Sequence, residues 1–195
     1  MTKYTFLLIT LLLSAIYAEA QTSFTLSADA PSLIYGGYSL EGGVNRKKMR
    51  YTFSLDNIKL PNYINADFDS IQALRQNIRL KASRFLSKKQ KGFHIGVGLG
   101  FVIGEEWSLL DSAGKVNTSI PSVEQSYATV GFNVGYIYHP FKNKAFIKGF
   151  YVEPSIGATY AIGKEDLKLG LKIIEKEPMS VTPIRFSLGW RIKLP

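Results

Sequence analysis

The most informative feature of the sequence is an alternation of apolar and polar residues that recurs along most of the chain. From residue 93 to residue 103 every odd position is apolar, whereas the even positions begin with His94, Gly96, Gly98 and Gly100. Residues 184–192 alternate in the same way, with arginine, serine and glycine between the apolar positions. Successive side chains of a strand point to opposite faces, so this period of two predicts β-strands that each have one apolar face.

The alternation predicts seven strands, and the parity of their connections adds an eighth. The seven are expected over residues 33–45, 48–58, 77–87, 92–104, 126–139, 146–162 and 180–192. Short basic connections alternate with long polar ones, which is typical of an up-and-down antiparallel sheet. Bacterial single-chain barrels have an even number of strands. We therefore expect one more strand over Ser23 to Asp29.

Residues 71–85 form the ambiguous part of the pattern, because their apolar positions also fit helical spacing. Ile71, Leu74 and Ile78 recur at intervals of three and four. We expect a loop with a helical turn over residues 69–74 that leads into the strand beginning near residue 77.

The residues on the polar faces favour a closed barrel over a soluble sandwich. They are mainly glycine, serine, threonine and asparagine, with a few charges of both signs. Small residues and pairable charges suit the confined lumen of a small barrel, whereas the outer face of a sandwich carries long hydrated side chains. The fold predicted is all-β, an eight-stranded antiparallel up-and-down transmembrane β-barrel.

The first twenty residues have the pattern of a cleaved export signal. Lys3 precedes an apolar stretch over residues 6–18, and Ala18-Glu19-Ala20 is a small-x-small cleavage site. Residues 1–20 are therefore expected to be a signal peptide and residues 21–195 a single barrel domain. The alternative is an uncleaved anchor helix, for which the stretch is shorter than the ~20 residues that a membrane span needs.

Composition removes several classes of function. The chain has no cysteine, which excludes disulfides, thiolate metal sites and a cysteine nucleophile. Its net charge is +9, and an exported basic protein is expected to meet acidic lipid head groups or polysaccharide rather than nucleic acid.

Charged residues on the polar faces are the main candidates for a site. In a barrel of eight strands such side chains interlock and fill the lumen more often than they line a pore. We therefore predict a lumen charge network. Its members are Glu41, Arg50, Asp56, Arg79, Lys81, Glu153, Arg185 and Arg191.

Other polar and aromatic residues suggest weaker hypotheses. The two histidines, His94 and His139, fall on the inward faces, but no spacing joins either to a carboxylate or a serine, so no catalytic, metal or cofactor site is predicted. Trp107, after Glu105 at the start of a predicted loop, is expected to be an interfacial anchor. The membrane-interface aromatics predicted on the strands are Tyr38, Tyr136, Tyr138, Tyr160 and Trp190.

The sequence resembles the small eight-stranded outer-membrane β-barrel proteins of the Bacteroidetes type. The resemblance rests on the signal, on residues 85–93 and 149–157, and on the ending Ser187-Leu188-Gly189-Trp190-Arg191-Ile192. It implies a porin-like protein of the Gram-negative cell envelope, located in the outer membrane among outer-membrane lipid and lipopolysaccharide. It also implies that the barrel insertion machinery reads the last strand through Phe186, Leu188, Trp190 and Ile192. The tail after Ile192 departs from relatives that end on the aromatic residue itself.

Class membership leaves the function open, because barrels of this kind have several. We expect a non-enzymatic protein without a cofactor, whose filled barrel supports the envelope or whose surface loops bind an unidentified ligand. One alternative is a lipid-modifying enzyme in the same barrel. Another is a soluble barrel that binds an apolar ligand, which requires the apolar faces to point inward.

Overall fold

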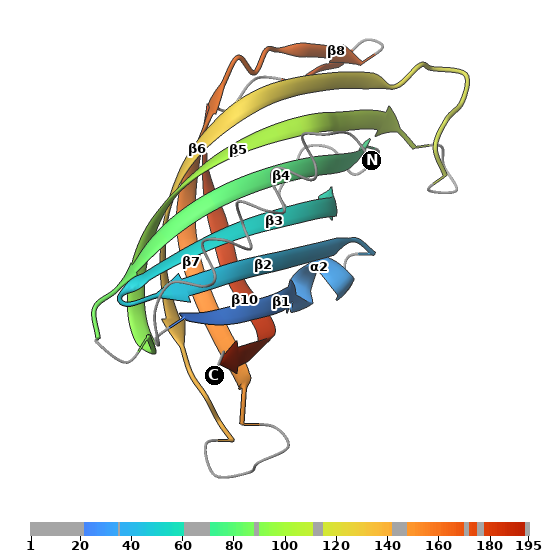
Figure 1. Cartoon of the computed structure of the whole chain (residues 1–195). Helices are drawn as coiled ribbons and strands as arrows, with labels where there is room; N and C mark the ends of the chain where they lie inside the picture. The colour runs from blue at the N-terminus through green and yellow to red at the C-terminus, as the bar shows by residue number, and fades with distance from the viewer. Residues whose placement is uncertain are drawn as a thin grey trace, which may run out of the picture.

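The chain folds into a closed barrel of eight antiparallel strands (Figure 1). The computed structural model describes residues 22–34, 36–60, 71–87, 90–110, 115–141, 148–169, 172–174 and 178–193. The barrel strands are β1 (Thr22–Asp29), β2 (Tyr38–Arg46), β3 (Met49–Leu60), β4 (Ile71–Phe85), β5 (Gly92–Leu109), β6 (Val123–Ile137), β7 (Phe150–Ile162) and β10 (Met179–Lys193). Each pairs with its neighbour in this order, and β10 pairs with β1. The predicted eight-stranded up-and-down barrel is confirmed.

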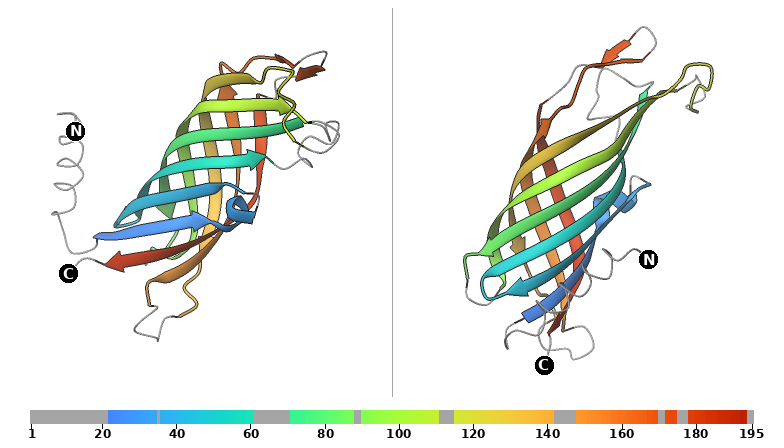
Figure 2. Two further views of the ribbon diagram at one scale, coloured as in Figure 1. Left: turned by 90° about the vertical axis from the view of Figure 1, so that its right-hand side faces the viewer. Right: turned by 45° about the horizontal axis from the view of Figure 1, so that its top comes forward.

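The two ends of the barrel differ in the elements that connect the strands (Figure 2). At one end, the short-turn end, β2 joins β3, β4 joins β5 and β6 joins β7. The other end, the long-loop end, holds the helix α2 (Ala30–Ile34) and a hairpin of β8 (Leu167–Leu169) and β9 (Lys172–Ile174). None of the helices in the described ranges has the length and apolar character needed to cross a membrane.

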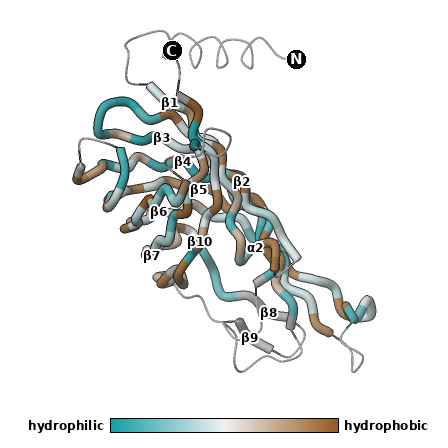
Figure 3. Tube along the Cα trace, turned by 90° about the horizontal axis from the view of Figure 1, so that it is seen from below, coloured by the Kyte–Doolittle hydropathy of each residue, from teal (hydrophilic) through white to brown (hydrophobic). Residues whose placement is uncertain are grey.

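The alternation in the sequence separates the outer face of the barrel from its lumen. Figure 3 shows hydrophobic and hydrophilic residues following one another along the strands. Outward side chains are apolar and exposed, for example Leu99 at 65% and Leu188 at 44%. The fully buried side chains include Arg50, His94 and Asn45, which point into the barrel. The molecule is therefore polar inside and apolar outside, the reverse of a soluble domain.

A short helix replaces the start of the predicted strand 33–45. Ser32 donates two hydrogen bonds to Oδ2 of Asp29, one from its backbone N–H at 3.3 Å and one from its hydroxyl at 2.7 Å. Asp29 therefore caps the first turn of α2. The helix ends before Gly36, which has a φ of 78°. β2 consequently begins at Tyr38, and a helix of five residues gives too short a period to be seen in the pattern.

The helical turn predicted over residues 69–74 is wrong where the structure describes it. β4 starts at Ile71 and pairs with β3 from Ala73 onward. The pairing of β4 with β3 continues without a register shift from Ala73 to Arg84, and the shift against β5 between Gln76 and Asn77 comes from an extra residue on β5. The period of two is lost in the sequence because the apolar Ala73 faces inward and the polar Gln76 faces outward.

β5 extends five residues beyond its predicted end at residue 104, and a bulge changes which face its last residues occupy. The pairing with β6 shifts between Val102 and Glu105. Odd positions point outward before the bulge and inward after it, so Glu105 is 0% and Trp107 4% exposed. The prediction that Glu105 opens a loop and that Trp107 is an interfacial anchor is therefore wrong.

The signal-peptide prediction falls on residues 1–20, which lie outside the described ranges.

Candidate functional site in the barrel lumen

Arg50 is the centre of the charge cluster nearest the short-turn end. Its side chain is 1% exposed. Nη1 donates to Oε2 of Glu153 at 2.5 Å, and Nη2 donates to Oε1 of Glu41 at 2.7 Å. Nη2 also lies 3.3 Å from the hydroxyl of Tyr151, and Nε2 of His94 lies 3.1 Å from Oε1 of Glu153. One guanidinium therefore links β2, β3 and β7 across the lumen, and we call these five residues the Arg50 cluster.

A second group of charges, the Asp56 cluster, lies closer to the long-loop end. Oδ2 of Asp56 is 2.6 Å from Nη2 of Arg79, and Oδ1 accepts a hydrogen bond from the hydroxyl of Ser39. Arg185 donates through Nε to Asp29 at 3.3 Å and through Nη2 to Ser39 at 2.9 Å, and its Nη2 is 4.0 Å from Asp56. The cluster thus ties β10 to β1, β2 and β3, on both sides of the pair that closes the barrel.

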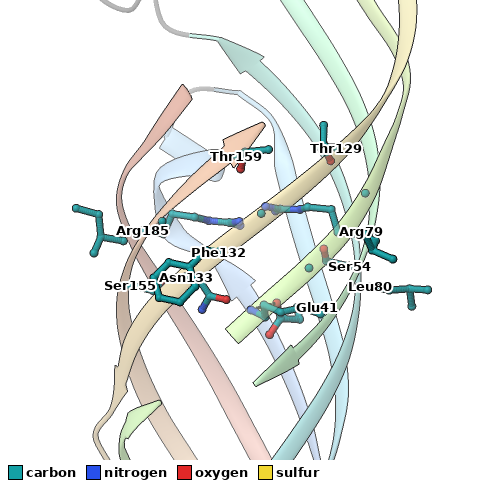
Figure 4. Close-up of a pocket in the computed structure, with 17 residues that line it drawn as sticks. Glu41, Ser54, Arg79, Leu80, Thr129, Phe132, Asn133, Ser155, Thr159 and Arg185 are labelled. Carbon is teal, nitrogen blue, oxygen red and sulfur yellow. Dashed lines mark hydrogen bonds and ion pairs between the residues drawn. The ribbon is translucent and has the colours of Figure 1, made fainter. Parts of the chain in front are cut away.

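A cavity of about 80 Å³ separates the charged wall from the opposite wall. Arg79 and Arg185 extend toward one another into it from β4 and β10 (Figure 4). Lys81, whose Nζ is 2.9 Å from Oε2 of Glu41, also borders it. The far wall is formed by β5, β6 and β7, where side chains are short. Its lining includes Gly98, Gly100, Thr129, Gly131, Asn133, Ser155, Gly157 and Thr159.

The cavity explains why the two clusters differ in exposure. The Arg79 and Arg185 side chains are 28% and 21% exposed, because they border a space large enough for water. Arg50 and Glu153 are 1% and 3% exposed. Charges that water does not reach need counter-ions, and Arg50 is paired with two carboxylates, while its Nε is buried without a hydrogen-bond partner among the described residues.

Glu105 organises a third charged group at the long-loop end, which the sequence did not predict. Nε of Arg75 donates to its Oε1 at 2.8 Å, and the amide of Gln125 donates to its Oε2 at 3.0 Å. Nζ of Lys164 is 3.5 Å from the same Oε2 and 5.5 Å from the ring centre of Tyr127. These contacts fill the lumen above the cavity.

The structure places the predicted lumen charges on the inner wall and distributes them over the two clusters. Arg191 differs from the others, since it forms no ion pair with a described residue and both its Nε and its Nη2 are buried without a hydrogen-bond partner among these residues. The sequence analysis missed Asp29, Tyr151 and Arg75, because partners on strands far apart in the chain have no common spacing. The remaining predicted members take part in the contacts above. They are Glu41, Arg50, Asp56, Arg79, Lys81, Glu153 and Arg185.

The histidines lie apart from one another and have different neighbours. His94 is fully buried, packs edge-on to Phe85 with ring centres 5.6 Å apart, and contacts Glu153, a carboxylate that its spacing did not reveal. Nδ1 of His139 is 3.1 Å from the carbonyl oxygen of Phe150. The described part of the chain contains no group of three His, Cys, Asp or Glu side chains that could hold a metal ion.

The predicted interface and insertion residues all lie on the outer face. Tyr38 and Tyr160 are at the long-loop ends of their strands, whereas Tyr136, Tyr138 and Trp190 are at the short-turn end. The exposed fractions of these five range from 38% to 54%. On β10, Phe186, Leu188 and Ile192 are exposed in line with Trp190.

Comparison with known proteins adds a structural likeness. No protein-family model matches the sequence, and no curated protein matches it. The crystal structure of Neisserial surface protein A (NspA) aligns with 89% of this chain and 94% of that chain, at 14% identity and a TM-score of 0.43. The strand pairings described above establish the barrel, and its function is argued from its own residues.

Proposed function

We propose that the protein is a non-enzymatic outer-membrane β-barrel whose lumen is filled by side chains. The observation that carries this proposal is the reversed polarity, with Arg50 and Glu153 buried and a continuous band of apolar side chains exposed. A monomeric soluble protein rarely exposes a large contiguous apolar surface. Closure leaves no unpaired edge between the strands, as the bilayer core requires.

The short-turn end faces the periplasm in this proposal and the long-loop end faces the exterior, the usual arrangement in bacterial barrels. β5 and β6 carry the exposed polar residues Glu106, Glu124 and Ser126 at their long-loop ends, beyond their apolar band. This exposed end, with the β8–β9 hairpin, provides the surface for a binding role. The charged lumen supports a structural role for the barrel itself.

The two alternatives have less support. An apolar ligand inside the barrel would need an apolar lumen, whereas the described cavity is lined by Glu41, Arg79, Lys81 and Arg185. A lipid-modifying enzyme needs a histidine that a lipid can reach and a nucleophile beside it. His94 is inside the barrel, and neither of its ring nitrogens has a hydrogen-bonded serine among the described residues.

Substitution of one outward and one inward residue of β10 tests the membrane assignment. Leu188→Arg places a charge on the lipid-facing surface, at a cost of about 2 to 4 kcal/mol near the bilayer centre, whereas Ser187→Thr keeps the lumen polar. We expect the wild type and Ser187→Thr in the outer-membrane fraction, with different gel mobility before and after boiling, and Leu188→Arg poorly assembled. Recovery of the wild type in the soluble periplasm without a heat-dependent shift would contradict the proposal.

A further inference from the structure

The charge of the chain is distributed very unevenly between the two ends of the barrel. The three connections at the short-turn end, residues 46–48, 86–91 and 138–149, contain nine lysines and arginines and no aspartate or glutamate. This equals the net charge of the whole chain, +9. The connections at the opposite end, residues 30–37, 61–70, 110–122 and 163–178, contain five lysines and seven acidic residues. The short-turn end is therefore a basic rim, and the long-loop end is weakly acidic.

Two arginines of this end lie on the outer wall of the barrel. Arg46 of β2 is paired with Met49 of β3, and Met49 is paired with Arg84 of β4. Arg46 and Arg84 share the outward face with the apolar residues that precede them on their strands, and both are exposed. Their Cα atoms are two strand spacings apart, about 10 Å. Two arginine side chains can span this distance and bind one phosphate between them.

The apolar band above these arginines is short. On β4 only Ile78, Leu80 and Ala82 face outward between Gln76 and Arg84. Eight residues rise about 27 Å along a strand, or about 20 Å along the membrane normal at the usual barrel tilt, compared with the ~25 Å apolar band of outer-membrane barrels. Insertion of this side of the barrel therefore brings Arg84 to the level of the lipid head groups rather than into the aqueous phase.

We propose that Arg46 and Arg84 bind the phosphate groups of acidic phospholipids in the leaflet at the short-turn end. This inference rests on the proposed membrane function and goes beyond it by naming the lipid class and the residues. The lysines of the basic rim add attraction to an anionic surface, and no acidic residue in the three connections opposes it. The outward position of both arginines distinguishes a lipid ligand from a soluble polyanion, which would reach the lysine-rich turns more easily than the lipid-facing wall.

Local lipid composition can be measured with a tryptophan placed beside the two arginines. Tyr51 follows Met49 on the outer face of β3 and is 53% exposed. The fluorescence of the introduced tryptophan is obtained by subtracting the wild-type signal from that of the Tyr51→Trp protein. Its quenching is compared between two sets of mixed vesicles, in which either the phosphatidylglycerol or the phosphatidylcholine is brominated. We expect about fivefold preference for phosphatidylglycerol, which corresponds to about 1 kcal/mol for a basic residue near the surface.

The double variant Arg46→Gln/Arg84→Gln should reduce this preference to near one. The matched control Lys59→Gln/Lys168→Gln removes the same charge from exposed positions toward the long-loop end and should leave the preference unchanged. Equal quenching by both lipids in protein that has inserted, or an equal loss in the control, would overturn the lipid site. Failure to insert into either vesicle would instead overturn the proposed function. If detergent-solubilised wild type binds dextran sulfate and the double variant does not, the arginines bind a soluble polyanion and the lipid site is overturned.

Discussion

The Arg50 cluster and the Asp56 cluster use the same chemistry at different distances from water. In both, an arginine from one wall of the barrel binds carboxylates from neighbouring or opposite strands. Arg50 is 1% exposed, whereas Arg185 is 21% exposed beside the cavity. The comparison teaches that the short side chains of β5, β6 and β7 affect the energetics of charges on the other strands, because the space they leave admits water to Arg185 but not to Arg50.

The largest effect is expected from removal of the Arg50 guanidinium. Arg50→Gln leaves the buried Glu153 without its guanidinium partner and leaves Glu41 with Lys81, so the loss in unfolding free energy should be about 3 to 5 kcal/mol. Urea unfolding in detergent micelles measures it. Lys59→Gln, an exposed change on the same strand, serves as the control and should cost little. A loss below about 1 kcal/mol for Arg50→Gln would contradict the difference between the clusters.

Neutralisation of Glu153 should have the next largest effect. Glu153→Gln keeps the size of the side chain but leaves Arg50 with a single carboxylate, Glu41, at a cost of about 2 to 3 kcal/mol. Thermal unfolding in detergent gives the shift. Planar-bilayer recordings of the variant and of wild type should both show no sustained channel, since Arg50 and Tyr151 still fill this end. A stable large conductance in the wild type would mean that the lumen is open.

Arg185→Gln removes a guanidinium from the Asp56 cluster, which borders the cavity. Asp56 retains Arg79 and Ser39, Asp29 retains Ser32, and cavity water solvates what remains. The expected loss is about 1 kcal/mol, typical of partly solvated ion pairs. Added salt should reduce the difference between wild type and variant further. A cost equal to that of Arg50→Gln would show that the cavity excludes water.

The smallest effect is expected at Gly131 in the cavity wall. A Cβ added at Gly131 would meet the carbonyl oxygen of Ala158 and the hydroxyl of Thr159 at 3.4 Å, which is ordinary contact, so Gly131→Ala should change stability by less than about 0.5 kcal/mol. At Gly157 the added Cβ would lie 2.5 Å from the carbonyl oxygen of Phe132, so Gly157→Ala should cost about 1 to 3 kcal/mol. The same unfolding assay compares them, and equal losses would mean that the wall has no room.

The alternation of side chains was sufficient to predict the barrel, because each strand contributes its own period of two. The eighth strand, β1, was predicted from the parity of the connections and not from its own short pattern. The errors arose where local geometry changes the period, as at the bulge that turns Glu105 and Trp107 inward. A bulge adds one residue to one strand only, and a single sequence does not indicate the pairing that it shifts.

The inward position of the charges also followed from alternation, whereas their partners did not. Arg50 and Glu153 belong to strands that are not adjacent in the barrel, so no spacing in the sequence relates them. His94 was judged to have no carboxylate for the same reason. Tyr151 was overlooked because an aromatic residue on a polar face looks like a break in the pattern, although its hydroxyl contacts Arg50.

The pairing of β1 with β10 imposes an order on folding. In every other pair of neighbouring strands, the two barrel strands follow one another along the chain and can form a local hairpin. The closing ladder instead joins the two ends of the chain, pairing Ser23 with Lys193 and Asp29 with Ser187. Contacts of such high sequence separation form slowly, because a long loop must lose its entropy before the ladder forms. Until β10 has been synthesised, the free edges of β1 and β7 are sites at which chains can aggregate. A nascent chain of this protein therefore depends on being held unfolded until its last strand is complete.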